Sequence, residues 1–200
     1  MNFLAHLYLS GEKPAHRAGG FLADFIKGAS LNDFPADIQQ GVWLHRQIDT
    51  FTDSHYDVQQ AVSLLKPALR RYAGVAIDIL FDHLLAKDFE HYTSRDLTYF
   101  VAEIERQISE QLHYFPARAQ VVWSYCVNQQ WLINYAHWSG IERSFQGMAR
   151  RTGQNDFVSS LPIASEILPK IHQHFDNFWP QLFVFSQKSL VTLSKEDVEI

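Results

Sequence analysis

Helical periodicity runs through almost the whole chain, and no other feature constrains the fold as strongly. Apolar residues recur at intervals of three and four positions, as they do along the buried face of a helix. Alternating strand patterns and the hairpin dipeptides Asn-Gly and Asp-Gly are absent from the sequence. We therefore predict an all-α fold of about six to eight helices. The predicted helices cover residues 35–51, 73–89, 96–112, 116–138, 141–151 and 160–187.

The chain is long enough for one domain with a sizeable core. It has 200 residues, of which 46% are hydrophobic. We expect a single compact domain over residues 1–193 and a polar tail over residues 194–200. The segment 73–89 is apolar around most of its circumference, which predicts a central, buried helix.

Glycine and proline mark the expected breaks between helices. Residues 12–20 (EKPAHRAGG) predict a loop, and residues 30–34 predict a turn. Gly153 is expected to end the helix over residues 141–151. The last helix is expected to be interrupted or restarted near Pro162, Pro169 and Pro180.

Composition excludes several classes of protein. The net charge of −5 argues against a protein that binds nucleic-acid backbone. No apolar run reaches the roughly 18 residues of a membrane-spanning helix, and the opening MNFLAHLYLS lacks the features of a signal peptide. The single cysteine, Cys126, rules out an internal disulfide framework and fits a reducing compartment. We predict a cytoplasmic protein in which Cys126 is a core residue.

Aspartate and histidine are concentrated in the first half of the chain, although Asp is a poor helix former. Residues 1–100 hold ten of the thirteen Asp and six of the ten His. His45, Asp49 and Asp53 are spaced four apart, so they share one helix face, and His55 follows just beyond. This mixture of nitrogen and oxygen donors suits a divalent cation. The alternative is a solvated helix face with incidental acidic residues.

A second acidic segment lies inside the apolar helix predicted over residues 73–89. Asp78, Asp82 and His83 would be costly to bury there without partners. They either line a narrow exposed face or converge on the stripe that begins at His45, and we favour convergence. Asp24 and His6 each stand alone in apolar sequence, where either a satisfied core residue or a metal ligand is consistent with the pattern.

These segments together are typical of helical metal-dependent phosphohydrolases, in which a divalent ion polarises a phosphoryl oxygen and generates hydroxide. The sequence has no HExxH, CxxC, GxSxG or Walker motif. Six basic residues are either solvated surface or docking residues for an acidic partner. They are Lys66, Arg70, Arg71, Arg143, Arg150 and Arg151.

Four segments in order carry a resemblance to a known family. The segments MNFLAHLYLS, GGFLADFIKG, GVWLHRQIDTFTDSH and RRYAGVAIDILFDHLLAKDF resemble the acyl carrier protein phosphodiesterases, or holo-acyl-carrier-protein hydrolases. The resemblance implies a phosphoric diester hydrolase that removes 4′-phosphopantetheine from the serine of holo-acyl carrier protein. It also implies a divergent HD phosphohydrolase fold and a divalent ion, with Mn²⁺ expected and Mg²⁺, Fe²⁺ or Co²⁺ as alternatives.

The resemblance also assigns roles to residues. The metal ligands implied are Asp24, His45, Asp82, His83 and His6. The residues expected to orient ligands or carry a proton are Asp49, Asp53, His55 and Asp78. Because acyl carrier proteins are acidic, the five arginines above become the expected docking residues.

Two other functions remain open from the residues alone. One is a metal-free all-α module that binds a ligand or partner. The other is a metal-dependent hydrolase of nucleotides or other small phosphodiesters, although the sequence has no Gly-rich phosphate loop. We expect neither nucleic acid nor a membrane as a partner, and the oligomeric state is left open.

Overall fold

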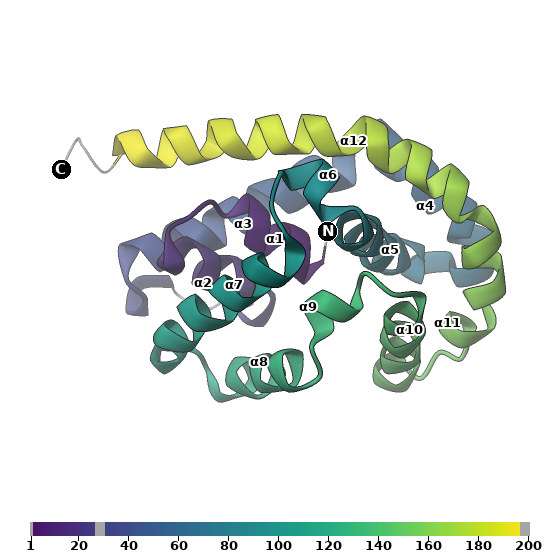
Figure 1. Cartoon of the computed structure of the whole chain (residues 1–200), viewed down its shortest axis with the longest axis horizontal. Helices are drawn as coiled ribbons and strands as arrows, with labels where there is room; N and C mark the ends of the chain where they lie inside the picture. The colour runs from purple at the N-terminus through teal and green to yellow at the C-terminus, as the bar shows by residue number, and fades with distance from the viewer. Residues whose placement is uncertain (1, 27–30, 197–200) are drawn as a thin grey trace.

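Helices follow one another along the described part of the chain, residues 2–26 and 31–196 of a computed structural model (Figure 1). Within these ranges the structure contains no strand, so the prediction of an all-α fold is confirmed. The helices are α1 (Phe3–Leu9), α2 (Pro14–Leu22), α3 (Ala36–Ser54), α4 (Tyr56–Leu69), α5 (Ala73–Lys87), α6 (Phe89–Thr93), α7 (Leu97–Gln111), α8 (Ala117–Asn128), α9 (Trp131–Asn134), α10 (Trp138–Thr152), α11 (Asp156–Ser159) and α12 (Leu161–Glu196). Short 3₁₀ turns occupy Ala23–Phe25, Leu31–Asp33, Arg70–Tyr72 and Leu112–Tyr114.

The chain divides into more helical segments than expected. Helices α3, α5, α7 and α10 lie close to their predicted ranges, and Gly153, at φ +70°, ends α10 as expected. The prediction of a single helix over residues 116–138 is wrong. The segment forms α8 and α9, which are separated by Gln130 with a left-handed backbone at φ 50°. Helix α4 was not predicted. Of the turn predicted over residues 30–34, Leu31–Asp33 form a 3₁₀ turn and residue 30 lies outside the described residues.

The loop predicted over residues 12–20 is also wrong, since α2 begins at Pro14, a residue suited to a first helical turn. Gly19 of α2 and Gly41 of α3 allow these two helices to pack closely, whereas Gly20 faces Ser10. A Cβ atom on Gly19 would lie 2.8 Å from the Gly41 Cα, and a Cβ on Gly41 would lie 2.8 Å from the His16 Cα. Both positions therefore require glycine for the approach of two backbones.

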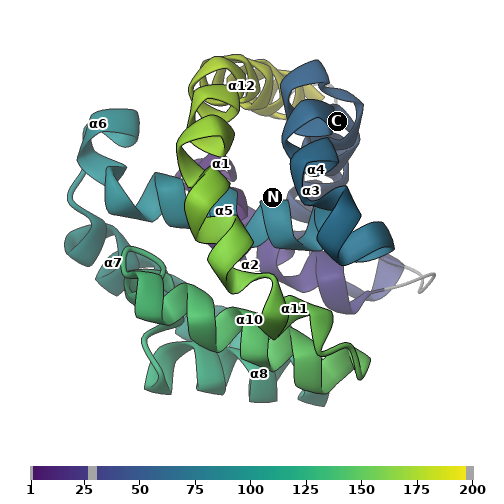
Figure 2. The ribbon, with the colours of Figure 1, turned by 90° about the vertical axis from the view of Figure 1, so that its right-hand side faces the viewer.

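Helix α5 is the central element, as predicted from its apolar circumference. It contacts α1, α4, α10 and α12, and Figure 2 shows α12 crossing over it. Residues 79–86 are all buried. Two rings of α12, Phe175 and Phe178, pack on Phe81 of α5 at centroid distances of 5.1 and 5.7 Å. The core of the molecule lies around this helix.

Helix α12 arches over the molecule and bends along its length (Figure 1). Pro169 and Pro180 lie inside it, and each removes a backbone hydrogen bond and bends the helix without ending it. The helix continues to Glu196, past the start of the predicted tail, and residues 197–200 lie outside the described residues. None of the described helices combines the length and apolar character needed to cross a membrane.

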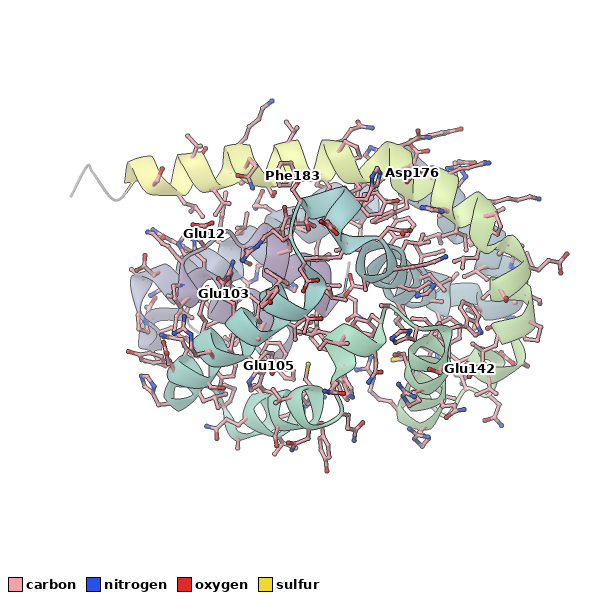
Figure 3. The ribbon with its side chains drawn as sticks, viewed as in Figure 1. Glu12, Glu103, Glu105, Glu142, Asp176 and Phe183 are labelled. Atoms are coloured by element: carbon pink, nitrogen blue, oxygen red, sulfur yellow. The ribbon has the colours of Figure 1, made fainter. Side chains whose placement is uncertain are left out.

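A buried arginine ties α2 to α7. Arg17 is 1% exposed and contacts Glu103, which is labelled on α7 in Figure 3. Arg17 Nη1 also donates to Gln107 Oε1 at 2.6 Å, and Arg17 Nε donates to the Gly11 carbonyl at 2.7 Å. These contacts satisfy a charge that would otherwise be costly to bury.

Candidate metal centre

Helices α1 and α3 bring His6, His45 and Asp49 together in the N-terminal half of the fold. The two carboxylate oxygens of Asp49 each lie 3.1 Å from one imidazole, Oδ1 from His6 Nε2 and Oδ2 from His45 Nε2. The two rings stack at 3.8 Å with 17° between their planes. One ligand atom from each residue lies within 4.8 Å of the other two. This is a donor set of two nitrogens and a carboxylate.

The orientation of His45 is fixed by the close contact between α2 and α3. Its Nδ1 donates a hydrogen bond to the Gly20 carbonyl at 2.8 Å, so Nε2 is the nitrogen directed at Asp49. A backbone carbonyl that holds one imidazole nitrogen is the usual arrangement around a metal-binding histidine. No sequence pattern predicted the contact with this carbonyl.

His6 is 2% exposed, and neither of its ring nitrogens has a hydrogen-bond partner among the described residues. Its Nε2 is close to Asp49 but lacks the alignment of a hydrogen bond. Burial, and next the neighbouring His45, lowers the pKa of His6 to about 3, against a smaller opposing effect of Asp49. A neutral imidazole with an unsatisfied buried nitrogen is the form of histidine that binds a metal ion.

Carboxylates surround this pair of histidines. Burial raises the pKa of Asp49, but its contacts with His45 and His6 outweigh burial and hold that pKa well below its usual range. Asp24 Oδ1 lies 3.8 Å from His45 Nε2. Burial raises the pKa of Asp24, His45 lowers it, and Asp49 and Asp78 add to the rise. Burial and then Asp78 likewise raise the pKa of Asp53. Bringing a cation here would relieve this repulsion.

Asp82 reaches the start of α1 rather than the group of three ligand atoms. It is fully buried, and it accepts hydrogen bonds from Leu4 N at 2.8 Å and Ala5 N at 3.3 Å. Burial raises the pKa of Asp82 to about 7, against these backbone donors. Asp82 therefore holds the helix that carries His6.

His83 and His55 face away from the cluster. His83 Nδ1 donates to the Tyr135 carbonyl at 2.7 Å, and burial lowers the pKa of His83. His55 precedes α4, and its Nδ1 accepts from Asp57 N at 3.2 Å. Of the residues expected to converge on the His45 face, Asp78 is coupled electrostatically to Asp24 and Asp53, whereas Asp82 binds the start of α1 and His83 binds Tyr135. Asp24, a separate candidate, does lie beside His45. Cys126 is buried, which raises the pKa of its thiol to about 12, as expected of a core residue.

The five predicted docking arginines are all exposed. Arg71 Nη2 donates to the Tyr72 hydroxyl at 2.9 Å. The Tyr72 ring packs on Phe157 of α11 at 5.6 Å, and Phe157 packs on Phe145 of α10 at 5.8 Å. Through these rings, the turn that carries Arg70 and Arg71 is joined to the helix that carries Arg143, Arg150 and Arg151.

The fold and this cluster define an all-α protein with a His–Asp centre between its N-terminal helices. Comparison with known sequences identifies its family. A family described as "Acyl carrier protein phosphodiesterase" matches residues 1–182. The chain belongs to this family, and the predicted membership of an enzyme family named for a phosphoric diester hydrolase is confirmed.

Curated relatives carry the same name. The chain is similar to the acyl carrier protein phosphodiesterase of Photorhabdus laumondii, with 34% identity over 179 residues, 89% of this chain and 87% of the relative. It is 32% identical to that of Klebsiella pneumoniae over 184 residues, 91% of this chain and 95% of the relative. Against that of Yersinia pestis the identity is 34% over 76% of this chain and 79% of the relative. No solved structure matches the chain, so the HD-type fold stays a prediction.

Proposed function

We propose that the chain is a metal-dependent phosphodiester hydrolase that removes 4′-phosphopantetheine from the serine of holo-acyl carrier protein. The family and its relatives' names support the reaction and the protein substrate. The observation that carries the metal dependence is the His6–His45–Asp49 group, with its unsatisfied buried imidazole. The cytoplasm stays the predicted compartment.

The donor set fits a divalent ion of the first transition series. His6, His45 and Asp49 would hold the ion, with Asp24 as the nearest further carboxylate. Two imidazoles favour Mn²⁺, Fe²⁺ or Co²⁺ over Mg²⁺, which prefers oxygen ligands. When bound, such an ion polarises a phosphoryl oxygen and lowers the pKa of water.

The residues around the ligands provide orientation and proton transfer. The Gly20 carbonyl fixes the ring of His45, and Asp82 fixes the helix of His6. Asp24 and Asp53 are exposed, so solvent reaches the site on the side where these two carboxylates lie. Asp53 is coupled electrostatically to Asp49 and Asp78, and in this proposal it orients the ligands or carries the proton that the departing serine Oγ needs. His55 lies outside this arrangement.

The acidic carrier protein would dock on the five exposed arginines. Surface charges of one sign steer an oppositely charged partner and set its orientation. The ring contacts through Phe157 connect the two elements that carry these arginines.

Intact-mass spectrometry of holo-acyl carrier protein tests the reaction. The carrier is incubated with the protein and Mn²⁺, and in parallel with excess chelator. We expect conversion to the apo mass only when the metal is present. Conversion in both tubes would contradict the metal dependence, and an unchanged mass in both, with folded protein, would contradict the substrate.

A further inference from the structure

A hollow of about 490 Å³ lies on the side of α5 that carries His83. It is formed by the end of α5, the start of α10 and the first turns of α12, which approach one another in Figure 2. The side chains that give it its chemistry are His83, Lys87, His137, Trp138, Ser139 and Ser165. None of these belongs to the His6–His45–Asp49 group.

The buried imidazole in this hollow has an unused nitrogen. His83 is 4% exposed, and its Nδ1 must donate, because the Tyr135 carbonyl can only accept. In the neutral ring, Nε2 is then an acceptor. It has no hydrogen-bond partner within residues 2–26 and 31–196, although it belongs to a residue that lines the hollow. A ligand at this place should therefore offer a hydrogen-bond donor.

The remaining groups attract negative charge. Lys87 contributes an ammonium group, and Ser139 and Ser165 contribute hydroxyls. Helix α10, 15 residues long, begins at Trp138 and has no side chain capping its N-terminus. Backbone N–H groups at such a helix start, together with the helix dipole, bind oxyanions. A ligand for this hollow is thus an anion that also carries a proton to donate.

We propose that this hollow binds the phosphate group of a phosphomonoester. A phosphate monoanion has oxygens that accept from Lys87, the serines and the start of α10, and a P–OH that donates to His83 Nε2. Trp138 and Leu168 provide an apolar wall for an organic substituent. The second pKa of a phosphomonoester is about 6, so this monoanion is the main form at about pH 5.5. Sulfate has no proton at that pH and lacks the donor that His83 requires. The site is separate from the metal centre and does not rest on the proposed function.

Isothermal titration calorimetry on the full chain, after treatment with chelator, tests the site. At about pH 5.5, where both phosphates are mainly monoanions, we expect saturable binding of inorganic phosphate and tighter binding of phenyl phosphate. Sulfate should bind about tenfold more weakly than inorganic phosphate because one hydrogen bond is lost. Lys87→Ala should lower the affinity for phosphate about tenfold, because a charge-assisted hydrogen bond is lost. Lys188→Ala, an exposed lysine on α12, should leave binding unchanged.

The Asp49→Asn variant tests whether phosphate binds apart from the candidate metal centre. Its affinity for phosphate should equal that of the native chain. Absence of saturable binding would overturn the proposal. Equal affinity for sulfate and phosphate would also overturn it, as would equal binding by the Lys87→Ala and Lys188→Ala variants.

Discussion

The Asp82 carboxylate connects the buried core of α5 to the position of His6. It accepts from two successive N–H groups at the start of α1, and asparagine could accept only one of them in the same geometry. We predict that Asp82→Asn lowers the free energy of unfolding by about 1–3 kcal/mol, the cost of leaving a buried donor unsatisfied. Urea denaturation of the metal-free protein measures this. Unchanged stability would show that Asp82 does not hold α1.

The same contact predicts an effect on catalysis. Asp82→Ala should abolish turnover of holo-acyl carrier protein while the far-ultraviolet circular dichroism spectrum stays helical, because α1 carries His6 into the cluster. Full activity of this variant with a normal spectrum would contradict the role of Asp82 in the site.

At single residues, the sequence predicted what helical spacing can encode. His45 and Asp49, four apart on α3, do lie together. Spacing could not show that His6 approaches from another helix or that the Gly20 carbonyl orients His45, because both are tertiary contacts. Spacing also could not predict the direction of the His83 side chain. Helix α5 is apolar around most of its circumference, so its pattern does not distinguish one buried face from another.

The contact between α2 and α3 positions the candidate metal centre, because Gly20 of α2 orients His45 of α3. An alanine Cβ at Gly41 would collide with the backbone of His16, which cannot rotate away as a side chain can. We predict that Gly41→Ala lowers the free energy of unfolding by about 1–3 kcal/mol or more, and lowers Mn²⁺ affinity through the displaced α2. Denaturation and calorimetry measure the two effects.

Gly147→Ala is the matched control for this prediction. A Cβ at Gly147 in α10 meets no atom within 4 Å, so the substitution should stabilise the chain by about 0.5–1 kcal/mol. If both substitutions had the same effect, the close approach of α2 and α3 would not matter for stability.

At the level of elements, periodicity located the long helices but not their interruptions. The glycines of α2 predicted a loop, but they lie in a helix in which Gly19 packs against the backbone of α3 and Gly20 faces Ser10. The left-handed Gln130 divides a stretch whose apolar pattern reads as continuous. Pro169 and Pro180 bend α12 without ending it, because its apolar face stays packed on α5.

The contact between Arg17 and Glu103 contributes to the loss of stability of the whole molecule in acid. Arg17, and less strongly Arg95, holds the pKa of Glu103 below its ordinary value of 4.5, against burial. A lowered carboxyl pKa means that the contribution of Glu103 is present above about pH 4.5 and is lost as the pH falls through the folded pKa. Glu103→Gln should lower stability at pH 7 by about 1–3 kcal/mol. The difference from the native chain should narrow below pH 4.5 in denaturation series, and a constant difference would contradict this account.

Docking of the carrier protein is a property of the surface as a whole. We predict that reversing the charge of Arg70 and Arg71 to glutamate raises the apparent KM for holo-acyl carrier protein about tenfold at low salt and leaves kcat nearly unchanged. Arg118→Glu, at an exposed position on α8, is the control and should have little effect on KM. An unchanged KM in the double variant would remove these arginines from the docking surface.

The central claim is that His6, His45 and Asp49 hold the divalent ion that the reaction needs. Calorimetric titration of Mn²⁺ into chelator-treated protein tests it most directly, with Asp49→Asn compared with Glu142→Gln, an exposed carboxyl on α10 that is labelled in Figure 3. We predict that Asp49→Asn lowers the affinity for Mn²⁺ by about 100-fold or more. Even the loss of a residue that hydrogen-bonds to a metal ligand typically lowers metal affinity by about 10–100-fold. Glu142→Gln should bind as the native chain does. Mn²⁺ binding of native strength in Asp49→Asn would contradict the claim.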